Sequence, residues 1–172
     1  DGNPLPTDLT PTGEVEMTIE SETTVFLETE GSEPLTIGSV TVNSDLLLAG
    51  TIVFRGTTGA AGVGASRLLE TPFLLPVVQD GARGIRTGFA LMNPVDRQVE
   101  LELTLRSGDG VPLAEATCSL PPFGHLARFA DELHWTPLLG QTLELSTIGG
   151  VLEVKPSGGV AATVLYPRPG QF

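Results

Sequence analysis

Strict alternation of apolar and polar residues is the dominant pattern in this chain, and it predicts β-strands. The clearest case is Val99–Arg106, where every second residue is valine or leucine and the residues between them are Glu, Thr or Arg. Glu14–Glu20 alternates in the same way, with Val15, Met17 and Ile19 on one face. No window sustains the 3.6-residue apolar period of a helix. The pattern therefore predicts an all-β protein.

Shorter apolar runs bounded by Gly, Pro, Asn and Asp predict the remaining strands. Ser107–Gly110 has the composition of a hairpin turn, and Pro121–Gly124 is expected to turn the chain again. The small-residue segment Thr57–Ser66 is expected to be a loop, and His125–Leu133 is expected to contain one short helical turn. We expect Ig-like β-sandwich units of the Greek-key type. The further predicted strands are Thr23–Glu28, Leu35–Val42, Leu46–Phe54, Phe73–Val78, Gly88–Met92, Val111–Leu120, Thr142–Ser146, Val151–Val154 and Val160–Tyr166.

An internal repeat predicts how these strands are divided into units. Val40–Phe54 aligns without a gap with Leu152–Tyr166, at a spacing of 112 residues that places Val42 on Val154 and, just upstream, Gly38 on Gly150. Two whole copies of this length do not fit in 172 residues. Fixed-period similarity is typical of modular proteins. We therefore predict an extended arm at 1–13, an N-terminal unit at 14–70 that is the rear part of a repeat, and a C-terminal β-sandwich unit at 71–172.

Three short motifs carry a resemblance to a known module. They are GFALMNP at Gly88–Pro94, HLARF at His125–Phe129 and VAA at Val160–Ala162. Together they resemble a β-sandwich module of roughly a hundred residues that recurs in large secreted or surface proteins of environmental bacteria. The resemblance covers Phe73–Tyr166, and it implies an extracellular or cell-surface location. Its motifs are turn and strand signatures, so it implies no catalytic residues.

Charge and hydropathy restrict the partners of the chain. The net charge of −12, with Lys155 as the single lysine, argues against binding to nucleic acid or to anionic lipid. No stretch approaches 18 apolar residues, so no membrane span is expected. The chain begins at Asp1 without a signal peptide. This start fits a mature secreted protein, and a fragment of a longer chain would look the same.

The residues that could support catalysis are few and unsuitably spaced. The chain has one cysteine, Cys118, and two histidines, His125 and His134, and it lacks a Gly-x-Ser-x-Gly motif. A zinc site made from these residues with Glu132 would match no standard ligand spacing. No Asp-rich calcium loop is present. We therefore predict a protein that is not an enzyme and that needs neither cofactor nor metal.

The segment around Trp135 is the only other candidate for a ligand site. Trp135 is expected to close one end of the sandwich, His125 to bond to the backbone, and Arg128 to pair with Asp131. The alternative function is a surface module that adheres to a glycan or another ligand, with Trp135 at the centre of an exposed aromatic pair.

The preferred prediction is a structural subunit that assembles with itself. Shifting the strand at Pro72–Val77 by the repeat length places its counterpart at 184–189, beyond Phe172. The second sandwich is then short of one strand, which a neighbouring subunit could supply by β-strand addition, head to tail, to give a filament. The alternatives are that the arm folds back onto its own chain or that the gap only marks the end of a fragment. The donor side chains would be Leu5, Leu9, Val15, Met17 and Ile19.

Overall fold

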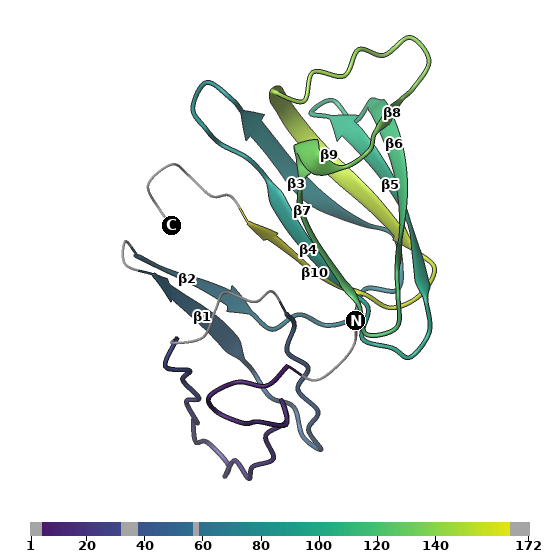
Figure 1. Ribbon diagram of the computed structural model, residues 1–172. Coiled ribbons are helices and arrows are strands. Elements are labelled where there is room, and N and C mark those ends of the chain that lie inside the picture. Colours follow the sequence, from purple (N-terminus) through teal and green to yellow (C-terminus); the bar gives the residue numbers. More distant parts are fainter. Residues whose placement is uncertain (1–4, 32–37, 57–58, 166–172) are drawn as a thin grey trace.

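The structure, a computed structural model, describes residues 5–31, 38–56 and 59–165, and antiparallel β-strands dominate it. The strands form a two-stranded hairpin β1-β2, a three-stranded sheet in the order β10-β4-β7, and a five-stranded sheet in the order β3-β9-β5-β6-β8 (Figure 1). The predicted all-β class is therefore confirmed. The strands are β1 (Thr51–Gly56), β2 (Gly59–Gly64), β3 (Phe73–Asp80), β4 (Gly88–Met92), β5 (Val99–Ser107), β6 (Pro112–Leu120), β7 (His125–Phe129), β8 (Thr136–Pro137), β9 (Thr147–Pro156) and β10 (Ala161–Leu165).

The core lies between the five-stranded sheet and the three-stranded sheet. Every second residue of β5 is buried, from Val99 to Leu105, because successive side chains of a strand point to opposite faces. Phe89 and Leu91 of β4 are buried in the same apolar cluster from the other sheet. The result is a β-sandwich, while its Ig-like, Greek-key topology stays a prediction. The buried apolar residues are Leu75, Val77, Phe89, Leu91, Val99, Leu101, Leu103, Leu105, Ala114, Leu120, Ala130, Ile148, Leu152, Val154 and Val160.

Both predicted turns of the C-terminal part are present. Gly110 has a φ of 80°, and its N–H donates to the carbonyl oxygen of Ser107 at 2.9 Å, which closes the β5–β6 hairpin. Gly124 donates in the same way to Pro121 at 2.9 Å and leads into β7. The two turns lie at opposite ends of β6: the first brings the chain back beside β5, and the second leads it across to β7 in the three-stranded sheet.

Asn93, in the GFALMNP motif, joins the loop after β4 to the turn after β6. Its buried side-chain amide donates to the carbonyl oxygens of Arg97 at 2.6 Å and Pro121 at 2.8 Å, and its Oδ1 accepts from the N–H of Val95 at 3.1 Å. A buried amide needs such partners, since an unpaired polar group costs about 1–3 kcal/mol. The loop after β4 and the turn after β6 are thereby held to each other.

The strands predicted before Thr51 are absent where the structure describes this part of the chain. Glu14–Glu20, Thr23–Glu28 and residues 38–50 have no strand. Of the predicted strand Leu46–Phe54, only Thr51–Phe54 is present, as part of β1. Residues 35–37 of the predicted strand Leu35–Val42 lie outside the described residues. These predictions were wrong because alternation gives a segment one apolar face but supplies no neighbouring strand to accept its backbone hydrogen bonds.

Two further predictions need correction, and the short helical turn predicted within His125–Leu133 is present but is preceded by a strand. The segment Thr57–Ser66 is not a loop throughout, because β2 pairs with β1 from Gly59 to Gly64; Thr57 and Thr58 lie outside the described residues. Thr142–Ser146 is not a strand, although Leu143 and Leu145 still pack against the core. Between His125 and Leu133 the chain first forms β7, and its single turn of 3₁₀-helix covers only Ala130–Glu132. Gly- and Ala-rich β2 carries no apolar alternation that could have predicted it.

Candidate assembly surfaces

The N-terminal segment exposes the five apolar side chains that were predicted to be a donor strand. Their exposed fractions lie between 38% and 48%, and every residue of 14–20 is exposed. The five residues are Leu5 (43%), Leu9 (42%), Val15 (48%), Met17 (40%) and Ile19 (38%). Both faces of this segment are therefore open to solvent, as expected for a strand-like pattern without a partner.

The arm at the start of the chain is folded rather than straight. Thr7 and Thr10 exchange two backbone hydrogen bonds, of 2.9 and 3.1 Å, around a tight turn. The carboxylate of Asp8 also accepts a hydrogen bond from the N–H of Glu30. The prediction of an extended arm is therefore wrong for residues 5–13. Figure 1 shows this purple part of the chain as an irregular loop beside the β1–β2 hairpin.

The outer edge of β10 is the complementary feature of the C-terminal unit. β10 pairs with β4 on one side, and on its other side Val160 and Leu69 exchange two hydrogen bonds of 2.8 and 3.1 Å. In an antiparallel ladder, alternate residues direct both backbone groups to the same side. The N–H and C=O groups of Ala162 and Val164 therefore point to the same side as those of Val160. Within the described residues, no segment pairs with them.

The other sheet edges carry features that discourage pairing. β3 contains Pro76, which has no N–H to donate, and β8 is only two residues long and ends in Pro137. β7 carries the exposed residues His125 and Arg128. Short strands, prolines and charges are the usual protection of edge strands. β10 has neither a charged residue nor a proline, so it is the least protected edge of the two sheets.

An ion-pair cluster joins the loop before β4 to the 3₁₀ turn. Arg86 donates to Asp131 at 2.8 Å and to Glu132 at 3.3 Å, and its guanidinium stacks on the ring of Phe129 at 3.9 Å. The predicted partner Arg128 is therefore wrong, because the β4–β7 register brings Gly88 opposite Phe129 and so carries Arg86 to the turn. Burial raises the pKa of Asp131, but hydrogen bonding and charge from Arg86 outweigh it and leave the pKa below its ordinary value.

A second ion pair stabilises the outer face of the larger sheet. Arg106 on β5 donates to Glu153 on β9 at 2.6 Å, and Lys155 lies 3.8 Å from the same carboxylate. The hydrogen bond from Arg106 and both positive charges lower the pKa of Glu153. This face is therefore occupied by cross-strand polar contacts, which do not form a binding site for an external group.

The residues considered for metal or catalytic chemistry do not converge. Cys118 is half-buried on β6, and burial raises the pKa of its thiol, as expected of an unreactive cysteine. His125 begins β7 and is exposed, and no hydrogen bond of its ring to another described residue is present. Among the described residues, no group of three or more His, Cys, Asp or Glu side chains is placed to hold a metal ion.

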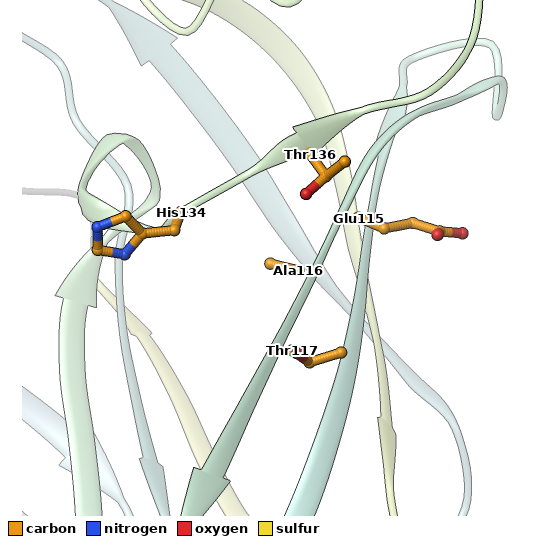
Figure 2. A pocket seen from close by; sticks show the side chains of 5 residues that line it. All are labelled: Glu115, Ala116, Thr117, His134 and Thr136. Carbon is orange, nitrogen blue, oxygen red and sulfur yellow. The ribbon is translucent and has the colours of Figure 1, made fainter.

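A shallow hollow lies where β8 begins beside β6, but its polar groups point apart. It is lined by Glu115, Ala116, Thr117, His134 and Thr136. Figure 2 shows the imidazole of His134 and the carboxylate of Glu115 directed away from each other, on opposite sides of β6. General acid–base work needs two groups within hydrogen-bond reach of one substrate atom. This hollow does not bring such a pair together.

Trp135 packs against the core and uses its polar group internally. It is partly buried, and its Nε1–H donates to the carbonyl oxygen of Ala130 at 2.7 Å. A sugar platform requires the flat face of an aromatic ring to be free. The role of Trp135 in ligand binding stays a prediction, and none of the contacts described for its ring adds support to it.

The comparisons with known proteins add no relative. Neither protein-family models, nor curated proteins, nor solved structures gave a match to this chain. The resemblance to the bacterial surface module therefore stays a prediction. Where the structure describes the chain, no helix is long and apolar enough to cross a membrane.

The edge of β10 is the feature that reasoning from the sequence did not identify by residue. The uncharged run from Val160 to Leu165 is visible in the sequence. Its open side depends on pairing with Leu69 and β4, which are 91 and about 73 residues away along the chain. The bridge between Leu69 and Val160 shows which residues of β10 direct their backbone N–H and C=O groups to the outer side of the strand, and which direct them to β4.

Proposed function

We propose that this chain is a non-catalytic structural subunit of an extracellular or cell-surface assembly, and that it polymerises head to tail by β-strand addition. The observation that carries the proposal is the edge of β10, where Ala162 and Val164 direct backbone groups outward without a partner among the described residues. An edge of this kind accepts a strand from another chain unless charge, proline or a bulge prevents it.

The N-terminal segment supplies the other half of the contact. Val15, Met17 and Ile19 alternate with polar residues, so a strand formed by this segment has one apolar face. Each backbone hydrogen bond formed on the edge of β10 contributes about 1 kcal/mol net. Burial of the three exposed side chains adds about 1.5–3 kcal/mol each when it is complete. These gains offset the loss of conformational freedom when residues 14–20 become a strand.

The geometry of the contact favours a chain of subunits over a closed dimer. The donor segment and the acceptor edge are different surfaces of the same protein, so the contact is heterologous. A heterologous contact leaves one donor and one acceptor free at the two ends of every oligomer. Subunits can therefore add at either end, and the chain grows unless the rotation between subunits closes a ring.

The first test substitutes Val164 by proline. Val164→Pro removes the N–H that points to the open side of β10 and places ring atoms in its position, so an incoming strand cannot pair there. We expect the wild-type protein to form concentration-dependent oligomers in sedimentation velocity and short filaments in electron micrographs, and we expect Val164→Pro to remain monomeric. The matched control is Val164→Ala, which loses side-chain packing to a similar extent but keeps the N–H and should assemble.

The second variant addresses the donor. Removal of residues 1–20 deletes the alternating segment and should also give a monomer, and the truncated chain should bind to the end of a wild-type oligomer through its intact β10. Trp135 fluorescence verifies that each variant keeps a folded sandwich, because the indole N–H donates a hydrogen bond to the carbonyl oxygen of Ala130. A wild-type protein that stays monomeric at high concentration contradicts the proposal, as does a Val164→Pro variant that assembles like wild type.

A further inference from the structure

Two segments with matching sequences have opposite environments in this molecule. Leu152, Val154 and Val160 of the C-terminal unit have no accessible surface. Their counterparts in the repeat, at the same spacing of 112 residues, are Val40 (68% exposed), Val42 (69%) and Leu48 (43%). The N-terminal copy therefore has apolar residues like those that are fully buried in the C-terminal copy, but no strands cover them among the described residues.

The C-terminal unit shows which surfaces bury such a segment. β9 lies between β3 and β5, with Leu152 opposite Leu75 on one side and Leu105 on the other. Val154 lies opposite Phe73 and Leu103 in the same two strands. After β9 the chain crosses to the second sheet, where β10 pairs with β4. A segment of this pattern thus needs three receiving strands, equivalent to β3, β5 and β4.

Backbone hydrogen bonds give an independent check on this equivalence. In the repeat, Gly50 corresponds to Ala162. The carbonyl oxygen of Gly50 accepts a hydrogen bond of 2.8 Å from Ala65, on the side of β1 where β2 pairs. The carbonyl oxygen of Ala162 points to the open side of β10, by alternation from Val160. β2 therefore lies on the side of β1 that corresponds to the open side of β10.

The opposite side of β1 follows from the same correspondence. β10 uses that side to pair with β4, whereas β1 pairs only with β2 among the described strands. Ile52, Val53 and Phe54 of β1 are also exposed. Among the residues that the structure describes, the hairpin thus has a vacant edge at the position where a strand like β4 belongs.

We propose that residues 38–56 are a docking segment for the front half of another unit of this same kind, comprising strands equivalent to β3–β8. The equivalents of β3 and β5 flank residues 38–44, and the equivalent of β4 pairs with β1. An intact second copy of this chain does not fit, because its β3, β4 and β5 are already covered by its own β9 and β10. This inference does not rest on the proposed function, which uses residues 14–20 and the edge of β10.

The test supplies the missing surfaces in two fusions. In the first, a second copy of residues 71–146 is joined ahead of Asp1 of the whole chain. In the second, this copy replaces residues 1–34 and is joined directly ahead of Leu35, which reproduces the spacing of the repeat. The readout is amide hydrogen exchange, followed by mass spectrometry, in peptides that cover residues 38–56. We expect exchange in these peptides to slow by at least about tenfold in one or both fusions, relative to the unfused chain.

A matched substitution separates docking from a general effect of the added polypeptide. Val42→Asp places a charge at a position that docking would bury, so it should abolish the gained protection in the fusion. The same substitution in the unfused chain should leave exchange in the C-terminal unit unchanged, because Val42 is exposed there. Thr41→Asp, at the neighbouring exposed position, is the charge control and should retain the protection.

Two results overturn the inference. In the first, residues 38–56 exchange as fast in both fusions as in the unfused chain. In the second, protection is gained but survives Val42→Asp. If the added copy captures residues 147–165 instead, protection in 38–56 is again not gained, which also overturns it. Filament formation by wild type does not enter either outcome, so this proposal and the proposed function fail separately.

Discussion

Val154 and Val42 are valines at equivalent positions of the repeat, but Val154 has no exposed surface and Val42 is 69% exposed. The segments around them have similar apolar patterns, and only one of them forms a strand. Residues 147–156 have β3 and β5 on either side, whereas residues 38–44 have no paired strand among the described residues. The difference teaches that an alternating pattern specifies a face, while neighbouring strands decide whether a strand forms.

The largest difference between the two copies is expected at their equivalent glycines. A Cβ at Gly150 would overlap the carbonyl oxygen of Arg106 on the adjacent strand, whereas a Cβ at Gly38 would make an ordinary contact of 3.4 Å with Leu5. Gly150→Ala should therefore lower the free energy of unfolding by about 3 kcal/mol, and Gly38→Ala should change it by less than about 0.5 kcal/mol. Denaturant unfolding followed by Trp135 fluorescence measures both.

Gly149→Ala is the control within the same strand. A Cβ at Gly149 meets no atom within 4 Å, so this variant should unfold like wild type. Equal destabilisation by Gly149→Ala and Gly150→Ala would mean that loss of glycine, rather than contact with Arg106, is responsible.

The second difference concerns the paired valines. Val154→Ala removes two buried methyl groups and leaves a cavity, so it should lower the free energy of unfolding by about 2 kcal/mol. Val42→Ala should stay within about 0.5 kcal/mol of wild type, because its side chain is already exposed. Similar losses from the two variants, measured in the same denaturant titration, would show that residues 38–44 are packed in solution and would break the comparison.

The smallest difference is expected between two ion pairs. Arg86 holds the pKa of Asp131 below the ordinary value of 3.8 against the opposing effect of burial, whereas Arg55 and Glu28 pair in the N-terminal half with 73% and 74% of their side chains exposed. A lowered folded-state pKa contributes stability that is complete above the unfolded value and is lost as the pH falls through the folded value.

Arg86→Gln should therefore cost about 0.5–1 kcal/mol at pH 6, and the cost should disappear as the pH falls well below 3.8. Arg55→Gln should have no measurable effect at either pH, because exposed pairs contribute little. The free energy of unfolding measured from pH 6 to pH 2 checks both. A cost for Arg86→Gln that is constant over this range would point to its stacking on Phe129 instead.

The sequence predicted the bounds of several strands accurately. β5 and β6 were predicted to within one residue, because they form a hairpin around the turn at Ser107–Gly110. β4 was predicted with its observed bounds, although its partners β7 and β10 are distant along the chain. Contacts between residues that are far apart along the chain could not be predicted from the sequence. The contact of Arg86 with Asp131 depends on the β4–β7 register, and the open side of β10 depends on the bridge between Leu69 and Val160.

The candidate surfaces were predicted only in part for the same reason. Leu5, Leu9, Val15, Met17 and Ile19 were proposed as donor side chains from an arm that leads into the alternating segment 14–20, and the structure leaves all five exposed. The turn at Thr7–Thr10 could not be predicted, because several prolines and threonines are compatible with both an extended and a folded arm. The edge of β10, the proposed acceptor, was not identified because the sequence contains nothing that shows which side of a strand is left without a neighbour.

Residue-resolved hydrogen exchange at Ala162 and Val164 tests the central proposal, strand addition at β10, most directly. Both amides point to the open side of β10, while those of Ala161 and Thr163 point to β4. In dilute monomer, we predict fast exchange at Ala162 and Val164 and slow exchange at Ala161 and Thr163. In concentrated, assembled protein, all four should exchange slowly, and the peptide 14–20 should gain protection with them. Assemblies in which Ala162 and Val164 still exchange as fast as in the monomer would contradict the account.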